Sequence, residues 1–272
     1  MSEWVVESSQ LSDTGRRRRN NEDYVACYEP TQPADLQAIG RIYVLADGVG
    51  GAAAGEVVSE YVVKRIISYY TREQADDLPG RLVRAIEAAN AEVFARNGRR
   101  EDQREMATTV VAAVIRGDRL IIANVGDSRA YLVVGQTIQQ ITHDHSLVAE
   151  MVREGAITSG QAETHPYRNV ILRSVGSQAV VKIDVFSQRV GPHDRVVLCS
   201  DGLTRRVADS EIAQITVDHP PAQAARRLIE LANERGGEDN ITVSIAHITD
   251  KPFVGTPDQA GQPPQVPRWE DP

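Results

Sequence analysis

Seven short stretches of apolar or alternating residues recur along the chain, and each has the length and pattern of a β-strand. They lie at residues 4–7, 42–46, 109–115, 120–125, 130–134, 196–199 and 241–248. Strands in this number are enough for two sheets. They come in consecutive runs, which favours separate layers of sheet and helix over a regular alternation of strand and helix.

Three segments instead repeat apolar residues at helical spacing. Their faces carry Val58, Val62, Ile66 and Tyr69; Leu82, Ile86, Ala89 and Val93; and Ala224, Leu228 and Leu231. A further short helix is predicted at 146–154. Because the first two helices lie together between runs of strands, we predict an α+β domain in which helices cover a sandwich of two sheets.

The chain has the length and composition of a protein with one substantial core. It has 272 residues, of which 41% are hydrophobic, and no internal linker divides it. We therefore predict one domain over residues 1–249. Residues 250–272 are rich in proline and have little apolar periodicity, which predicts a disordered tail.

Charge and cysteine content restrict the partners and the compartment. With 30 Lys+Arg against 38 Asp+Glu, the net charge is −8, which argues against binding to nucleic acid or to an anionic membrane. Cys27 and Cys199 form no disulfide framework, and no apolar run approaches the roughly 18 residues of a membrane span. No segment resembles a secretory leader. We expect a cytoplasmic monomer that acts on small molecules or proteins.

Several predicted strands end in an aspartate beside a glycine. The pattern occurs at Asp47-Gly48, Gly126-Asp127 and Asp201-Gly202. A glycine there lets the backbone turn sharply, so that the carboxylate and a neighbouring carbonyl can face the same cleft. One such pair alone is more often an ordinary turn, but its repetition indicates a shared site.

Further acidic residues stand near both ends of the predicted domain. Glu22 and Asp23 lie close to its start, and Asp239 precedes Asn240 close to its end. If these side chains converge with the strand-end aspartates, they form a centre of hard oxygen ligands without a histidine or cysteine cluster. Such ligands favour magnesium or manganese, with calcium possible, over zinc or copper.

Seven motifs, in the expected order, resemble those of the metal-dependent type 2C serine/threonine protein phosphatases in their bacterial, stand-alone form. They are GRRRRNNED at 15–23, LADGVGG at 45–51, ATT at 107–109, NVGDSRA at 124–130, THDHS at 142–146, LCSDGL at 198–203 and DNIT at 239–242. The resemblance covers residues 1–249. It implies a four-layer α-β-β-α sandwich, in which two mostly antiparallel sheets are flanked by pairs of helices and the metals lie in a channel at one end.

The resemblance also implies two or three divalent cations, Mn²⁺ or Mg²⁺, held by residues at matching motif positions. Asp47 would bridge two ions, and Gly48 would offer its carbonyl to one of them. Asp201 and Asp239 would complete the ligands of the first ion, so that these three aspartates form the catalytic centre. The remaining roles fall to Glu22, which binds the second ion through water, Asp23 in the adjoining water network, Asp127 at a third, weaker site shared with Asp201, and Asn240 just outside the ligands.

The reaction implied is hydrolysis of phosphoserine and phosphothreonine by in-line attack of a hydroxide that bridges two metals. Alignment on the Asn-Glu-Asp triplet selects Arg18 to grip the phosphate in a bidentate manner. The other arginines of the run, Arg16, Arg17 and Arg19, leave an alternative open, namely a solvated basic turn or a peptide-docking patch.

The second motif departs from many eukaryotic members, because Val49 stands where they carry a histidine proposed to protonate the leaving group. We expect a metal-bound water, on the Asp127 site, to serve as the acid, and we assign no catalytic role to His143 or His145. Residues 155–169 match the position of the family's flap, which would contact protein substrates. The alternative for this stretch is an ordinary surface loop.

The implied substrates are phosphorylated proteins, modified by a serine/threonine kinase whose signalling the enzyme would oppose. One alternative is a catalytically weak scaffold that binds phosphopeptides. Against it, all the expected carboxylates are present. A second alternative is a hydrolase of small phosphoesters or nucleotides, but the sequence lacks the histidine-rich metal motifs usual in such enzymes.

Overall fold

Two antiparallel sheets stack face to face in the computed structural model, which describes residues 4–49, 53–73, 76–98 and 106–252. The first sheet has the order β1 (Trp4–Asp13), β11 (Ile241–Pro252), β10 (Arg195–Cys199), β7 (Arg129–Val134), β8 (Thr137–Gln140). The second has the order β2 (Asp23–Tyr28), β3 (Arg41–Val49), β5 (Val110–Arg116), β6 (Arg119–Val125), β9 (Asp184–Arg189), and β4 (Ala107–Thr108) pairs with the end of β3.

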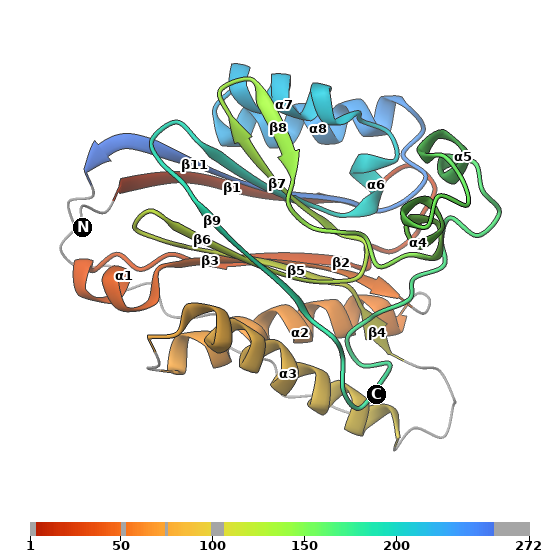
Figure 1. Ribbon diagram of the computed structural model, residues 1–272, viewed down its shortest axis with the longest axis horizontal. Helices are drawn as coiled ribbons and strands as arrows, with labels where there is room; N and C mark the ends of the chain where they lie inside the picture. Colours follow the sequence, from red (N-terminus) through yellow and green to blue (C-terminus); the bar gives the residue numbers. More distant parts are fainter. Residues whose placement is uncertain (1–3, 50–52, 74–75, 99–105, 253–272) are drawn as a thin grey trace.

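Helix pairs cover the outer face of each sheet (Figure 1). The pair α2 (Ala53–Arg72) and α3 (Leu78–Asn97) lies on the second sheet, and the pair α7 (Asp209–Asp218) and α8 (Pro221–Glu234) on the first. The short helices are α1 (Pro33–Ile39), α4 (Leu147–Arg153), α5 (Ser159–Glu163) and α6 (Asp201–Thr204). The predicted four-layer α-β-β-α sandwich is therefore confirmed.

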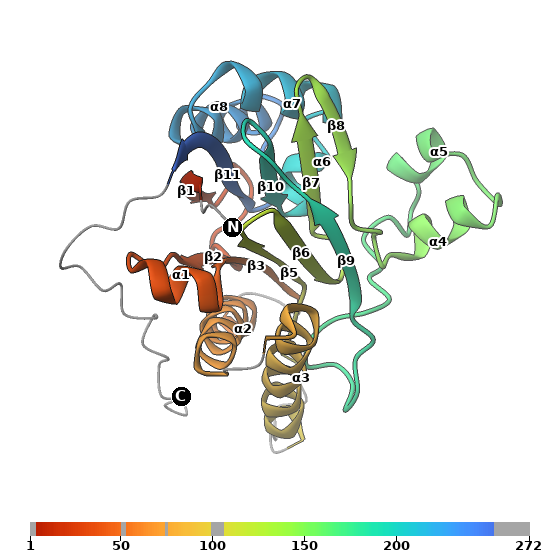
Figure 2. The same cartoon turned by 60° about the vertical axis from the view of Figure 1, so that its left-hand side comes forward.

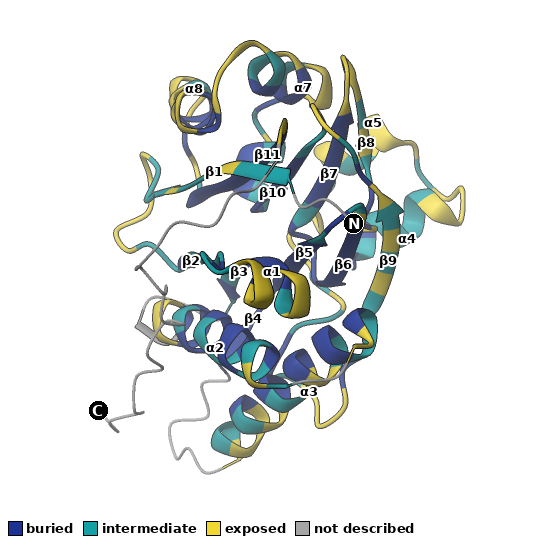
Figure 3. Ribbon diagram, turned by 90° about the vertical axis from the view of Figure 1, so that its left-hand side faces the viewer, coloured by how far each residue is buried: buried dark blue, intermediate teal, exposed yellow. Residues whose placement is uncertain are grey.

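Three buried layers follow from the alternation of side chains along the strands. In β3, Tyr43 and Leu45 pack between the two sheets, whereas Ile42 and Val44 face α2 and α3. A third layer, which includes Leu228 of α8, fills the space between the first sheet and its helices. Figure 3 shows the buried faces of strands and helices turned toward one another. Both faces of the central strands are covered, so these strands are apolar almost throughout.

All seven predicted strands and all four predicted helices are confirmed, although several boundaries differ. Strand β1 runs on to Asp13, because its polar, half-buried residues pair with β11. The strand at 109–115 begins at Val110, and β4 precedes it. Strand β11 continues to Pro252, past the start of the predicted tail at residue 250. The rest of that tail, 253–272, lies outside the described residues, as do Gly50 and Gly51 of the second motif.

The predicted flap, 155–169, contains a short helix, α5, where the sequence suggested only loop. A capping box opens it: the Thr158 side chain accepts from the Gln161 backbone N–H, and the Gln161 side chain accepts from the Thr158 N–H. None of the residues of α5 is buried. Figure 2 shows α4 and α5 projecting from the side of the sandwich. Within the described part of the chain, no helix is both long and apolar enough to cross a bilayer.

Candidate metal centre

The predicted metal-binding residues meet at one end of the sandwich, where strands of both sheets begin or end. Asp47 and Gly48 lie at the end of β3 in the second sheet. Asp201 follows β10 of the first sheet and opens α6, and Asp239 stands just before β11. The two sheets therefore bring together carboxylates that lie far apart in the sequence.

Asp23 joins the two sheets at this end. Its Oδ2 accepts hydrogen bonds from Ser200 Oγ and Thr242 Oγ1, each at 2.7 Å. Asp23 begins β2 of the second sheet, whereas in the first sheet Ser200 directly follows β10 and Thr242 lies at the start of β11. One buried carboxylate thus links the two sheets by hydrogen bonds beside the centre. Its other oxygen, Oδ1, is buried and has no hydrogen-bond partner.

The carboxylates crowd one another enough to shift their acidity. Burial, and then the charges of Asp201 and Asp239, raise the pKa of Asp23 to about 7. The pKa of Asp47 lies well above its ordinary value, first because its carboxyl loses water and then because Asp23, Asp201 and Asp127 are close. This mutual repulsion shows that the acids form one electrostatic unit.

A glycine holds Asp127 in place. Gly126 has φ 110°, and a Cβ there would lie 2.6 Å from the Thr109 Cβ, so only glycine fits. Its N–H donates to His145 Nδ1 at 3.1 Å, and its carbonyl accepts from the His145 N–H at 2.9 Å. The Asp127 carboxyl that follows is buried, and its Oδ1 has no hydrogen-bond partner. Burial, and then the charge of Asp201, raise the pKa of Asp127 to about 7.

The two oxygens of Asp201 have different surroundings. Oδ1 is buried without a hydrogen-bond partner, whereas Oδ2 forms an ion pair with Arg205 Nη2. Burial raises the pKa of Asp201, and the positive charge of Arg205 opposes that rise. The sequence analysis did not single out Arg205.

Of the four consecutive arginines, Arg18 is the one that reaches an acid of the centre. Its Nε and Nη2 lie 2.9 Å from Asp239 Oδ1 and Oδ2, a bidentate ion pair. The hydrogen bond to Asp239 is the main reason that the pKa of Arg18 is raised, and the charges of Glu22 and Asp47 add to it. All four arginines are exposed, so the ion pair with Asp239 and not burial distinguishes Arg18. Its role in binding phosphate stays a prediction.

Close backbone packing places Glu22 beside Gly48. The Gly48 N–H donates to the Glu22 carbonyl at 3.0 Å. A Cβ on Gly48 would lie 2.5 Å from the Gly55 carbonyl oxygen, and a Cβ on Gly55 would lie 2.7 Å from Glu22 Oε2. The Glu22 carboxylate therefore rests against the first turns of α2, next to the end of β3.

Asn240 fixes the segment that carries the arginine and Glu22. Its Oδ1 accepts from the Glu22 N–H at 2.8 Å, and its Nδ2 donates to the carbonyls of Thr14 and Asn20, both at 2.9 Å. All three contacts cross from the start of β11 to the loop between β1 and β2. The contacts suit the predicted place of Asn240 just outside the ligands.

The chemistry of this donor set fits divalent cations that bind oxygen. Three buried carboxylate oxygens, Asp23 Oδ1, Asp127 Oδ1 and Asp201 Oδ1, lack partners, and leaving such charges uncompensated costs on the order of several kcal/mol per ion. Among the described residues, no three Asp, Glu, His or Cys side chains stand close enough to enclose a bare ion. Carboxylate oxygens are the type of ligand that magnesium and manganese prefer.

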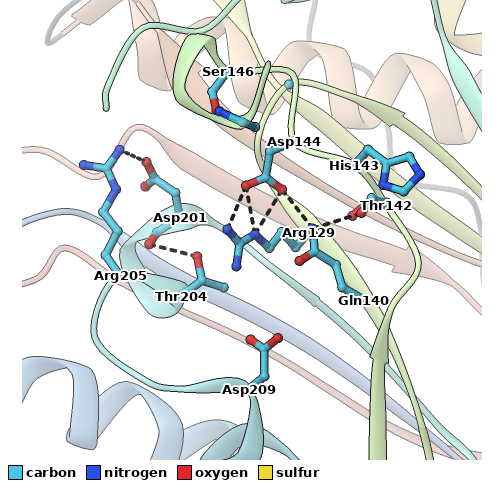
Figure 4. A network of polar contacts seen from close by, with 12 residues as sticks. Arg129, Gln140, Thr142, His143, Asp144, Ser146, Asp201, Thr204, Arg205 and Asp209 are labelled. Carbon is cyan, nitrogen blue, oxygen red and sulfur yellow. Dashed lines mark hydrogen bonds and ion pairs between the residues drawn. The ribbon is translucent and has the colours of Figure 1, made fainter. Parts of the chain in front are cut away.

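A polar network that the sequence analysis missed lies beside Asp201 and links the first sheet to the segment 142–146 (Figure 4). Arg129 of β7 binds Asp144 through Nη2 at 2.7 Å and through Nε at 3.0 Å. Gln140 Nε2 donates to the same carboxylate at 2.9 Å. The network fixes the segment 142–146 to the first sheet. Both charged residues fall inside recognised motifs, but their pairing depends on strand register that the sequence does not display.

The two histidines of the fifth motif have protein partners. His145 is buried, and its Nε2 lies 3.1 Å from Asp184 Oδ2 and 3.0 Å from Arg173 Nη1, while its Nδ1 accepts from Gly126. The His143 ring packs edge-on against Phe186, with centroids 5.6 Å apart. The sequence analysis assigned neither ring a catalytic role, and in the structure both rings contact protein groups.

The two-sheet sandwich, its helix pairs and an all-oxygen acidic centre beside an arginine define a metal-dependent phosphatase. Residues 16–241 match the family described as protein phosphatase 2C, and the chain belongs to that family. The resemblance stated from the motifs is confirmed.

Similar proteins and structures are serine/threonine phosphatases, in agreement with this family. The serine/threonine phosphatase stp of Listeria monocytogenes is 38% identical over 242 residues, which cover 86% of this chain and 92% of that protein. The serine/threonine protein phosphatase PstP of Mycobacterium tuberculosis is 38% identical over 253 residues, covering 93% of this chain and 47% of that longer protein. A crystal structure of the PstP catalytic domain in complex with 2 manganese ions superposes with a TM-score of 0.79 at 35% identity, covering 91% of this chain and 100% of that one.

Proposed function

We propose that this chain is an active protein serine/threonine phosphatase that hydrolyses phosphoserine and phosphothreonine with two or three Mn²⁺ or Mg²⁺ ions. The observation that carries the proposal is the convergence of Asp23, Asp47, Asp127, Asp201 and Asp239 at one end of the sandwich, where strands of both sheets begin or end. The raised pKa values of Asp23, Asp47, Asp127 and Asp201 agree with this crowding of carboxylates. A phosphate monoester is dianionic and would be repelled by such a site unless cations occupied it.

We assign the ligands as the sequence predicted. Asp47, Asp201 and Asp239 hold the principal ions with the Gly48 carbonyl, and Asp127 shares a further ion with Asp201. Glu22 and Asp23 bind through water. When bound, such ions lower the pKa of water and neutralise charge on the phosphoryl oxygens.

Arg18 orients the phosphate in this proposal. Its guanidinium offers two parallel N–H donors, the geometry that matches two phosphoryl oxygens. In the structure both donors are occupied by Asp239. Asp239 would offer the same oxygens to a bound ion, and Arg18 would then be free to bind the substrate phosphate. Asn240 keeps the arginine segment in reach by its contacts with Thr14 and Asn20.

The natural substrates in this proposal are phosphorylated proteins, modified by a serine/threonine kinase that the enzyme opposes. The net charge of −8 supports the absence of a nucleic-acid partner. Both cysteines are free, which suits a reducing cytoplasm. Burial raises the pKa of Cys27 and of Cys199 to about 12, so neither thiol is a reactive nucleophile near neutral pH. A cytoplasmic monomer remains our prediction.

The direct test is hydrolysis of an aryl phosphate and of a phosphothreonine peptide, with manganese and with a chelator. We expect turnover only with the metal. Asp47→Ala and Asp201→Ala should each lower kcat/KM by at least about a hundredfold, because several kcal/mol of charge stabilisation is lost. The matched control is Asp118→Ala, which removes a carboxylate that pairs with Arg189 away from the centre. Metal-independent turnover, or full activity in the two site variants, would refute the proposal.

A further inference from the structure

Arg205 links the candidate metal centre to the projecting segment 155–169. Its Nη2 forms an ion pair with Asp201 Oδ2, as Figure 4 shows, and its Nη1 donates to Asn169 Oδ1 at 2.7 Å. Arg205 directly follows α6, one helical turn after Asp201, so the same short element positions both the carboxylate and the arginine. Asn169 ends the segment. The two contacts of one guanidinium thus join a ligand of the centre to the flap.

The charge of Arg205 acts on two carboxylates of the centre. The pKa values of Asp127 and Asp201 are raised by burial, and in both cases the positive charge of Arg205 opposes the rise. Each of these carboxyls also has a buried Oδ1 without a hydrogen-bond partner. Arg205 therefore supplies part, but not all, of the positive charge that this pair of acids requires.

A divalent cation at the same pair would supply the rest and would repel the arginine. The ion carries twice the charge and approaches the oxygens more closely than a guanidinium does, so it competes directly for Asp201 Oδ2. The Arg205 side chain is 31% exposed, so a guanidinium displaced from Asp201 would move toward solvent. The bond to Asn169 would be lost with that movement.

The segment at the other end of the link has little else to hold it. None of the residues of α5 is buried. Ala156 and Ile157 bond to Met151 of α4, which projects together with α5. Just after the segment, the Leu147 N–H of α4 donates to the Val170 carbonyl, and the Leu172 N–H donates to the carbonyl of His145, which precedes α4. Loss of the Asn169 contact would therefore change its motion measurably.

We propose that Arg205 is a built-in cation that a divalent ion displaces from the Asp127–Asp201 pair, and that this displacement releases the segment 155–169 through Asn169. Arg205 thereby acts as a positioning residue that couples occupancy of the third ion site to movement of the flap. The inference rests on the ion site of the proposed function. It requires no turnover.

Two measurements test the coupling in the full-length protein, namely manganese titration by calorimetry and amide hydrogen exchange of 155–169 with chelator or with saturating manganese. In the wild type, the segment should exchange about tenfold faster with manganese than with chelator. Arg205→Gln should exchange fast in both conditions and should bind its weakest manganese ion about tenfold more tightly, because the competing charge is gone.

The adjacent arginine is a matched control. Arg206 pairs with Glu238 and with no carboxylate assigned to the centre, so Arg206→Gln should keep both wild-type values. Asn169→Ala removes the other partner of the Arg205 contact. In this variant the segment 155–169 should exchange its amide hydrogens fast with chelator, and manganese affinity should rise less than in Arg205→Gln. If Arg205→Gln does not fold, Asn169→Ala alone tests the coupling.

Several outcomes would overturn the inference. They are an unchanged manganese affinity in Arg205→Gln, and an unchanged amide exchange rate of 155–169 in Arg205→Gln or Asn169→Ala. A third is a change in affinity and exchange rate in Arg206→Gln as large as that in Arg205→Gln. If the wild type bound no manganese, the proposed function would fall as well. If manganese binding and both shifts appeared in a protein without phosphatase activity, only the proposed function would be refuted.

Discussion

Asp23 and Asp47 stand directly opposite each other in the antiparallel ladder between β2 and β3. Opposed residues in such a ladder point to the same face, and like charges there destabilise a sheet. Asp23 has found partners for only one of its two carboxylate oxygens, because Ser200 and Thr242 both bond to Oδ2. The pairing therefore weakens the fold by itself, and cations held by these carboxylates, as proposed above, would offset the repulsion.

The first prediction concerns this pair. Asp23→Asn keeps a carbonyl oxygen for Ser200 and Thr242 and places an amide where Oδ1 has no partner. With chelator present, we expect the variant to be more stable by about 1 kcal/mol, since the repulsion from Asp47 is gone. In a chain of this size that raises Tm by roughly 2–4 °C. Manganese affinity should fall about 10- to 100-fold.

Thermal melts with chelator and manganese titrations measure the two effects. Asp118→Asn, which alters a surface ion pair with Arg189, should raise neither Tm nor manganese Kd. A lower Tm for Asp23→Asn with chelator would show that repulsion between the two carboxylates does not control stability at this end of the sandwich.

The second prediction is a pH dependence of the metal-free protein. The pKa of Asp127 is raised from 3.8 to about 7, so the folded chain holds its proton more tightly than the unfolded chain. The stability linked to that proton is complete below pH 3.8 and is lost as the pH rises through about 7. Between these values the free energy of unfolding should fall, by on the order of a few kcal/mol.

Two histidines oppose this trend, so the measurement has to be a difference. Burial lowers the pKa of His145 and of His247 below 6.5, and these groups make stability rise with pH near that value. Melting curves with chelator from about pH 4.5 to 8 should therefore be compared between wild type and Asp127→Asn. The wild type should lose stability relative to the variant as the pH rises. Parallel curves would contradict the prediction.

The parts of the fold that the sequence predicted are those buried on a consistent face. Strands such as β5 and β6 are apolar runs, and the helices α2, α3 and α8 repeat apolar residues at helical spacing. The sequence analysis missed β9, whose alternating exposure leaves three half-buried positions, and α7, in which β-branched residues obscure the helical pattern. The apolar pattern of a strand or helix is weak in the sequence where only one of its faces packs against the rest of the protein.

Asp47, Asp127 and Asp201 were predicted because a glycine at a strand end marks each of them, and the other acids because they fall in motifs that resemble the family's. Their partners were not, for a physical reason. The pairing of Arg129 with Asp144 and that of Arg205 with Asn169 join segments whose distance depends on register and on loop path. The unpartnered oxygen of Asp127 is likewise a property of the folded site. Contacts between side chains of distant segments can be identified only once the fold is known.

The third prediction separates Arg18 from its neighbours. Arg18→Lys keeps the charge but loses the planar pair of donors, so kcat/KM for a phosphothreonine peptide should fall about 10- to 100-fold. Arg17→Lys, at an exposed position of the same run, should stay within about twofold of the wild type. Steady-state kinetics on both variants checks this. Equal losses would favour a basic docking patch over a single phosphate-binding arginine.

The last prediction asks whether His145 donates a proton to the leaving group. Burial lowers the pKa of His145, so the ring is neutral at pH 7. Nδ1 accepts from the Gly126 N–H, so a proton on the neutral ring can lie only on Nε2, which is held between Asp184 and the Arg173 guanidinium. Neither nitrogen has a proton available for a substrate. We therefore expect His145 to act only by positioning Gly126 and, through it, Asp127.

His145→Gln should then lower kcat by about tenfold, through a displaced Asp127, and weaken the binding of one manganese ion. The shape of the kcat profile against pH should stay that of the wild type, whereas loss of a general acid would change its alkaline limb. His143→Gln should remain within about twofold, because that ring only packs against Phe186. A changed alkaline limb in His145→Gln, with manganese binding intact, would make the histidine the acid and reverse the assignment.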